Sequence, residues 1–562
     1  MTALEPARHQ PSGEPSDDRL HRPMDAPSDR QDDSSGPARA PAVGRVPFPV
    51  VDEIARHCLQ DDEPETVHIE VHLPGRIDHA RIRTAFHQAL ARHPRILMRQ
   101  APVRWWRRRY AWQLTATPDT DPVLFPPPTA DALAQARRRA LVSCPPLDTS
   151  PPVRLEVIER SGGAGGTVLL LTINHTALDG PACLRVLATA AELYGGADNS
   201  PAPPPVRPHG AGPGIDPTPP GSPLPARRAF SRPARIAADH GVGQGDGHAP
   251  GYAADGAGDN SALSPAPDPA PGQGVVADSE GTGSGTERAD HGNHKAAGGH
   301  RHNGNGMLIV ELPVPARPPR VDGRAPYTVN DQLLVATCLT VARWNRLHAS
   351  PTSPVVVTMP VDDRPRGTDM PIGNGTRLVS VGFGPEEHRD AELLCANPPD
   401  PDAVTRLLRR TASRTRALKS ASGSQLGLAG TLLTAPVLPV GLRAAATRAL
   451  RTAAAPWTST TLLSNIGRIA YPLDFGDGGR PTAVWFSAPA RMPRGLTVTT
   501  VSVGGRIQLA LRWSHALLDD TAGARLGALF ANSLAATSWT GPSPEAPPPP
   551  LSPAPPAEGD AP

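Results

Sequence analysis

One long stretch that is rich in proline and glycine limits what this chain can fold into. Residues from about 196 to 306 are mostly Pro, Gly, Ala, Ser, Asp and His, as in "PAPPPVRPHGAGPGIDPTPPGSP". Structureless loops longer than ~15 residues are uncommon inside a compact domain. We therefore predict a disordered linker at 196–306, which separates two folded blocks at 44–195 and 307–540.

Both ends of the chain share this composition. Proline accounts for 71 of the 562 residues, far above the usual ~5%. Segments with so few large apolar residues cannot offset the entropy lost on ordering, so we predict disordered tails at 1–43 and 541–562. The linker also carries His291, His294, His300 and His302, a spacing that would allow metal binding. Solvated low-complexity chain is the favoured interpretation of these histidines, and no metal is predicted.

Charge, cysteine content and hydropathy exclude several classes of protein. The formal net charge is +2, so no nucleic-acid partner is indicated. Five widely spaced cysteines without a CxxC pair predict neither a zinc site nor a disulfide framework, which fits a reducing cytoplasm. The N-terminus lacks the apolar core of a signal peptide, and no run approaches the ~20 apolar residues of a membrane span. We expect a cytoplasmic protein without a transmembrane segment.

Hydrophobic periodicity predicts strands and helices in both blocks. In the first block, alternation at 65–75 and an apolar run at 167–174 predict strands, and helical spacing predicts a helix that begins after Asp78 and ends before Pro94. A second helix is predicted at 181–194. In the second block, strands are predicted at 307–314, 354–362, 460–468, 481–488, 495–503 and 506–517, and helices at 329–345, 403–420 and 521–534. Each block is therefore expected to be α+β, a mixed sheet with covering helices.

The stretch "TINHTALDGP", residues 172–181, places a histidine directly after the most apolar predicted strand. His175 is followed by Asp179 and Gly180, which spells HxxxDG. A histidine on a rigid strand end suits general-base chemistry, although an ordinary polar residue at a strand end remains the alternative. A second stretch, "WSHALLDD" at 513–520, repeats the histidine–aspartate spacing, but Asp520 replaces the glycine and the preceding strand is amphipathic. His515 is therefore the weaker candidate for a base.

A third stretch, "RWWRRRYAW" at 104–112, mixes arginines with aromatic residues. Its alternation predicts a strand with Trp106, Tyr110 and Trp112 on one face. The alternative is a docking patch for a phosphate group or a carrier protein.

Several separate segments resemble the chloramphenicol acetyltransferase-like acyltransferases. This superfamily includes nonribosomal peptide condensation domains, polyketide-associated acyltransferases, wax ester synthases and the plant BAHD enzymes. Besides "NHTALDG", the similar segments are "GRIDHARIRTAFHQALARHPRI", "CPPLDTSPPVRLEVIE", "YTVNDQLLVATCLTVARW", "MPVDDRPRG" with "IGNGT", and "TLLSNIGRI". They occur in the family's order, cover both blocks and skip the linker.

The resemblance implies a fold and roles for particular residues. It implies two subdomains in a V-shaped arrangement, with a tunnel between them and His175 at its middle. Asp179 would be a structural aspartate that pairs with an arginine, for which Arg364 is the candidate. Asn174 stands where condensation domains usually carry a further histidine. Asn174 and Asn465 are possible substrate-channel residues.

The implied reaction is transfer of an acyl group from coenzyme A or a carrier-protein thioester to a hydroxyl or amine. No cofactor is implied beyond acyl-CoA or an acyl-phosphopantetheine carrier as substrate, and the acceptor would be a small molecule or lipid. The setting would be lipid or natural-product biosynthesis, and a monomer is expected. Two alternatives stay open: a stand-alone condensation domain that forms an amide, and a degenerate module that only binds carrier proteins.

Overall fold

The computed structural model describes residues 39–60, 63–160, 165–201, 232–241, 304–320, 325–362, 364, 371–384, 387, 390–420 and 427–541. From Ala40 onward they belong to one compact unit. Most of the expected tails, and the histidines His291, His294, His300 and His302, lie outside the described residues.

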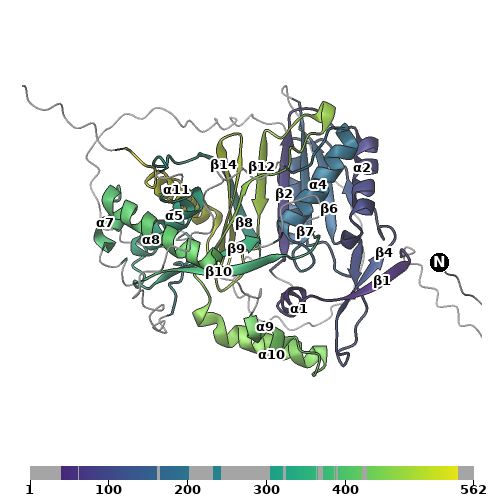
Figure 1. Ribbon diagram of the computed structural model, residues 1–562, viewed down its shortest axis with the longest axis horizontal. Coiled ribbons are helices and arrows are strands. Elements are labelled where there is room, and N and C mark those ends of the chain that lie inside the picture. Colours follow the sequence, from purple (N-terminus) through teal and green to yellow (C-terminus); the bar gives the residue numbers. More distant parts are fainter. Residues whose placement is uncertain are drawn as a thin grey trace, which may run out of the picture. The chain divides into compact units, whose positions relative to one another are not determined.

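The first sheet is built mainly by the first block and mixes parallel with antiparallel pairing (Figure 1). Its central strand β7 is buried along its whole length, as the apolar run predicts. Two helices pack on one face and α3 packs on the other. The strands, in order, are β12 (Ala483–Ser487), β2 (Thr66–Leu73), β7 (Thr167–Asn174), β6 (Val153–Glu159) and β5 (Val123–Leu124); the helices are α2 (His79–Arg92), α4 (Gly180–Gly195) and α3 (Ala132–Val142).

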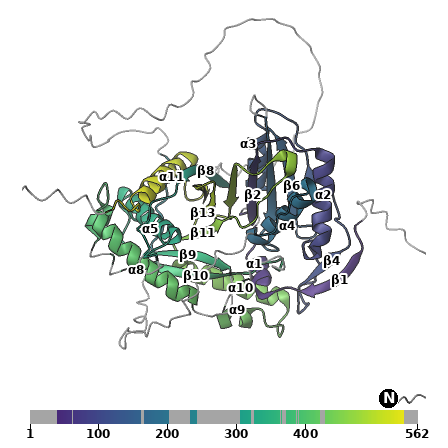
Figure 2. The same ribbon diagram turned by 45° about the horizontal axis from the view of Figure 1, so that its top comes forward.

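The second sheet is also mixed, and its buried face packs against helices of the second block (Figure 2). Thr328 caps the long helix α5 in a capping box with Asp331, which explains why that helix begins there. The strands, in order, are β10 (Thr376–Phe383), β9 (Val355–Asp362), β11 (Thr461–Arg468), β13 (Leu496–Val503), β14 (Arg506–Ser514) and β8 (Asn305–Pro313); the helices are α5 (Val329–Leu347), α7 (Ala391–Cys395), α8 (Pro401–Ser420) and α11 (Asp520–Ala535). The predicted α+β class is confirmed.

The two blocks are joined more closely than the sequence predicted. Strand β12 lies in the second block but pairs antiparallel with β2 of the first sheet. The buried Arg512 of β14 donates to the carbonyl oxygen of Thr66 at 2.8 Å and to its hydroxyl at 3.0 Å. Burial lowers the pKa of Arg512 to about 10. These contacts fix the edge of one sheet against the other, while the V-shaped arrangement of the halves stays a prediction.

Part of the expected linker is folded, contrary to the prediction. Residues 232–241 pack on the second core, where Ala234 and Ile236 are buried. Asn345 of α5 holds this segment through both ends of its amide, accepting from the Ala237 N–H at 2.9 Å and donating to the Arg235 carbonyl at 2.7 Å. The composition of residues 196–306, averaged over their whole length, concealed this short anchoring sequence.

The segment with arginines and aromatic residues is not a continuous strand. A turn occupies residues 105–106, and β4 (Ala111–Thr115) begins only afterwards, between β1 (Ala42–Pro47) and β3 (Met98–Gln100). Tyr110 and Trp112 are buried as predicted, but Trp106 is exposed, so the prediction of one shared face was wrong. None of the helices in the described part of the chain combines the length and apolar character needed to cross a bilayer.

Candidate functional site

His175 lies in the turn between the end of β7 and the start of α4. Its backbone N–H donates to the carbonyl of Glu65, just before β2, at 2.8 Å. The following turn is closed by the N–H groups of Ala177 and Leu178, which both donate to the Asn174 carbonyl. A buried central strand and a helix therefore hold this half-buried histidine from both sides.

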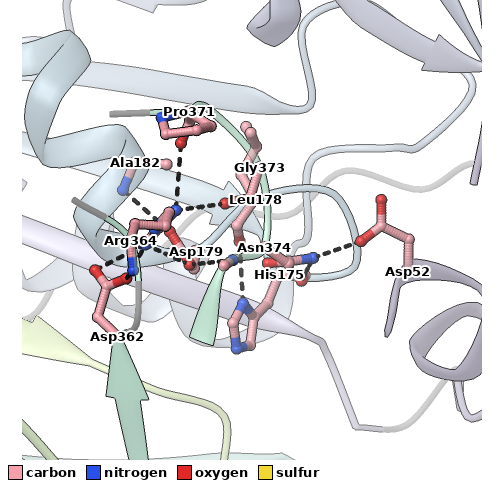
Figure 3. Close-up of polar contacts among 11 residues, drawn as sticks. Asp52, His175, Leu178, Asp179, Ala182, Asp362, Arg364, Pro371, Gly373 and Asn374 are labelled. Atoms are coloured by element: carbon pink, nitrogen blue, oxygen red, sulfur yellow. Dashed lines mark hydrogen bonds and ion pairs between the residues drawn. The ribbon is translucent and has the colours of Figure 1, made fainter. Parts of the chain in front are cut away.

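The imidazole of His175 has a defined tautomer. Its Nδ1 lies 3.0 Å from the carbonyl oxygen of Leu178. A carbonyl can only accept, so in the neutral ring Nδ1 carries the proton and Nε2 keeps the lone pair. Figure 3 shows the rest of the ring pointing away from the Arg364–Asp179 pair. The arrangement leaves Nε2 able to accept a proton from a bound group.

Asp179 and Arg364 form the ion pair expected from the resemblance. Arg364 Nη2 donates to Asp179 Oδ2 at 2.9 Å, and both side chains are almost fully buried. The other oxygen of Asp179 caps α4 by accepting from the Ala182 N–H at 3.0 Å. Burial by itself lowers the pKa of Arg364, but the hydrogen bond to Asp362 and the charge of Asp179 raise it overall. Asp179 thus ties the histidine turn to the second block.

Two glycines allow the close approach of these elements. A Cβ at Gly375 would collide with the Arg364 side chain, and the Gly375 N–H donates to Asp179 at 3.0 Å. At Gly180 a Cβ would lie 3.2 Å from the ring of Phe486 on β12. Gly180 is required for packing rather than for a positive φ, because its φ lies outside that region.

The two asparagines predicted at a substrate channel make structural hydrogen bonds. The buried Asn174 donates to the Pro145 carbonyl at 2.8 Å and accepts from the Thr176 N–H at 3.1 Å. Asn465 on β11 donates to Asn330 at 3.2 Å and accepts from the Gly467 N–H at 2.9 Å. Their roles at a channel, like the tunnel itself, stay predictions.

Sequence reasoning missed a buried group beside the histidine turn. Asn374 donates to the carbonyl oxygens of His175 at 3.3 Å and Thr176 at 3.0 Å, and to Asp52 of helix α1 (Val50–His57) at 3.0 Å (Figure 3). Trp112 Nε1 also donates to Asp52, at 2.8 Å. Burial raises the pKa of Asp52 to about 6, against the lowering effect of these hydrogen bonds. An acidic residue within the apolar "PFPVVDEIA" is the signal that could have revealed it.

His515, the second sequence candidate, occupies a similar turn in the other block. It follows β14 and precedes α11, and Asp519 caps α11 by accepting from the Ala522 N–H at 2.7 Å. However, Nε2 of His515 lies 3.0 Å from Asp520, the residue that replaces the glycine. A carboxylate therefore faces the nitrogen that is left able to accept in His175.

The described residues contain no group of three or more His, Cys, Asp or Glu side chains that could hold a metal ion.

No family model matches the chain. It is 25% identical over 485 residues to the uncharacterized protein Rv2305 of Mycobacterium tuberculosis strain H37Rv, which covers 84% of this chain and 94% of that protein. The same figures hold for the uncharacterized protein MT2362 of strain CDC 1551.

A solved structure identifies the fold. The TRI3 trichothecene 15-O-acetyltransferase from Fusarium sporotrichioides superposes with a TM-score of 0.52 at 10% identity, covering 90% of this chain and 98% of that one. The condensation domain of the monacolin K polyketide synthase MokA gives 0.49 at 13% identity, over 88% and 97%. The chain has the fold of the chloramphenicol acetyltransferase-like superfamily, and the predicted resemblance is confirmed at the level of the fold.

Proposed function

We propose that this protein is an acyltransferase in which His175 is the general base. The observation that carries the proposal is the hydrogen bond from Nδ1 of His175 to the Leu178 carbonyl, which leaves Nε2 as a base on a rigid turn. The superfamily fold and the ion pair between Asp179 and Arg364 support it.

In the proposed reaction, Nε2 of His175 removes the proton of an acceptor hydroxyl or amine as its oxygen or nitrogen attacks the thioester carbonyl. The tetrahedral intermediate collapses, the C–S bond breaks, and the imidazolium returns its proton to the leaving thiolate. General-base catalysis of this kind is typically worth ~10²–10⁴-fold in rate. The donor would be acyl-CoA or an acylated carrier protein, and the acceptor a small molecule or lipid.

Asp179 is assigned a positioning role in this proposal. Both of its oxygens are occupied, by Arg364 and Gly375 on one side and by the Ala182 N–H on the other. It is therefore not available to relay a proton from His175, whose Nδ1 bonds to a backbone carbonyl instead. Arg364 and Gly180 hold the same turn.

The proposal is tested by thioester turnover with a panel of acyl-CoAs and acyl carriers, with and without alcohol and amine acceptors. Wild type should release free thiol in an acceptor-dependent manner, and His175→Ala should reduce this rate by ~10²–10⁴-fold. A His175→Ala rate near that of wild type would refute the assignment of the base. Acyl-carrier binding by a wild-type protein that turns over no thioester would instead indicate a binding module.

A further inference from the structure

Helix α10 (Val440–Ala454) buries a charged side chain and exposes two leucines, unlike an ordinary surface helix. Its inward face carries the buried Arg443, which pairs with Glu53 of α1 at 2.7 Å. Its outward face carries Leu442 and Leu450, each about half exposed, among alanines. Surface helices of soluble proteins normally turn their apolar stripe toward the core and their charges toward solvent. Leucines left exposed on a helix of the described part of the chain therefore need an explanation.

The apolar surface extends beyond α10. In the preceding helix α9 (Gly427–Leu433), Leu432 is 75% exposed, and the turn between the two helices exposes Val437 and Leu438. At the other end of α10, Trp457 is half exposed. Figures 1 and 2 show α9 and α10 together at one rim of the molecule, beside α1. Contiguous exposed apolar surface of this kind marks an interaction site.

A loop from the first block adds two tryptophans and a cluster of positive charge. The N–H of Gly441 donates to the Trp105 carbonyl at 2.9 Å, and the N–H of Val440 donates to the Arg107 carbonyl at 2.7 Å. Trp105 is 64% exposed and Trp106 is half exposed. We call the surface formed by α9, α10, Trp457 and the loop at 103–109 the α9–α10 surface.

The charges on the α9–α10 surface are all of one sign. The arginines at positions 104, 107, 108, 109 and 448 are exposed. Neither 103–109 nor 427–457 contains an aspartate or glutamate. The chain as a whole is nearly neutral, with 56 basic and 54 acidic residues. The excess of positive charge is therefore confined to the same segments that form the apolar surface.

We infer that the α9–α10 surface docks the protein on an anionic lipid membrane. Leucines on a helix, tryptophans at the margins and exposed arginines are the combination that seats a protein at the boundary between headgroups and acyl chains. Arginines add attraction to anionic lipids that weakens with salt. An acidic carrier protein would complement the arginines, but it would leave the outward leucines and the valine-leucine turn without an apolar partner.

Helix α1 connects the α9–α10 surface with the turn that carries His175. Helix α1 contacts both α9 and α10. Through Asp52 it also contacts Asn374, which holds the His175 turn. A membrane at the α9–α10 surface would therefore lie on the side of the molecule where α1 supports the candidate site. The inference itself rests on surface residues and not on the proposed acyl transfer.

The test is co-sedimentation of the full chain with vesicles of phosphatidylcholine alone or mixed with phosphatidylglycerol, at low and high salt. Leu442→Glu combined with Leu450→Glu removes the apolar face of α10. Leu347→Glu is the matched control, because this leucine is 75% exposed at the end of α5 and outside the surface. Arg107→Ser with Arg108→Ser tests the charge. All four substituted positions in these two pairs are exposed, and melting temperatures check that the variants fold.

We expect wild type and Leu347→Glu to bind the anionic vesicles at low salt, and high salt to weaken binding. The leucine pair and the arginine pair should each weaken binding on the order of tenfold or more. Wild type that stays in the supernatant would overturn the inference, as would equal binding by Leu347→Glu and the leucine pair. Light scattering that shows self-association lost in the leucine pair, without vesicle binding by wild type, would overturn it in favour of a contact between copies. These readouts do not depend on thioester turnover.

Discussion

The two histidine turns share one backbone frame and differ in what surrounds the imidazole. In each turn, the carbonyl of the residue before the histidine (Asn174 or Ser514) accepts from the N–H groups of the second and third residues after the histidine. An aspartate four residues after the histidine caps the next helix. In the His175 turn a glycine follows that aspartate and Nε2 points away from the turn. In the His515 turn Asp520 takes the glycine position and contacts Nε2. One side chain thus separates a histidine able to accept a proton from one that is already paired.

The turns also differ in the segment that closes over them. Arg364 and Gly375 of the second block close the first turn by contacting Asp179. Residues 232–241 close the second, because Asp239 exchanges backbone hydrogen bonds with Leu517 and Asp519. Asp239 also pairs with His348 and Arg525. The first closure is a buried ion pair between the two blocks, and the second is a partly exposed set of ion pairs between residues 232–241 and the second block.

The largest expected effect on stability comes from the buried closure. Arg364→Ala leaves Asp179 buried and unpaired, which should cost about 3–5 kcal/mol of unfolding free energy and lower the melting temperature. Arg525→Ala removes an arginine that is 57% exposed and should cost less than about 1 kcal/mol. Thermal unfolding monitored by circular dichroism measures both. Equal melting temperatures for Arg364→Ala and wild type would contradict the role of the buried pair.

The carboxyl groups of Asp52 and Asp239, one beside each turn, should change the free energy of unfolding with pH in opposite directions. Burial raises the pKa of Asp52 to about 6, so the folded state holds this proton more tightly than the unfolded state. The resulting stability is present below the unfolded pKa of 3.8 and is lost as pH rises through about 6. The advantage of wild type over Asp52→Asn should therefore fall by about 2 kcal/mol between about pH 4 and pH 8 in urea unfolding.

At Asp239 the sign is reversed. The hydrogen bond from His348 lowers the pKa of this carboxyl, so its contribution is present above the unfolded pKa and is lost as pH falls. The advantage of wild type over Asp239→Asn should accordingly shrink toward acid pH in the same experiment. A difference in unfolding free energy between wild type and Asp52→Asn that stays constant with pH would show that burial does not raise the pKa of Asp52.

A smaller expected effect on stability comes from two asparagines, and kcat shows which of them also positions the proposed base. Asn374 holds the carbonyl oxygens of the His175 turn, while Asn345 holds residues 232–241 beside the other turn. Alanine at either position should cost about 1–3 kcal/mol of unfolding free energy. Only Asn374→Ala should also lower kcat, because it frees the turn that carries the proposed base. Equal kcat values in Asn374→Ala and Asn345→Ala would show that Asn374 is merely structural.

The positions of strands and helices were easier to predict from the sequence than the strands and side chains that they pair with. The strand at 481–488 was predicted from its apolar residues, but alternation does not encode which sheet a strand joins, and β12 pairs in the other block. The pairing of Asp179 with Arg364 was expected only because the resemblance supplied a partner 185 residues away. The segment "IGNGT" was matched by the resemblance, but neither Asn374 within it nor Asp52 was given a role, since each looks locally like a polar residue in a loop or at a helix start. Residues 232–241 were missed because composition averages over short anchors.

The central claim is that the His175 turn performs acyl transfer and the His515 turn does not. The most direct measurement compares acceptor-dependent thiol release by His175→Ala and His515→Ala under one set of conditions. We expect a loss of ~10²–10⁴-fold for His175→Ala and a rate within about twofold of wild type for His515→Ala. Loss of activity in His515→Ala with a folded, active His175→Ala would contradict it.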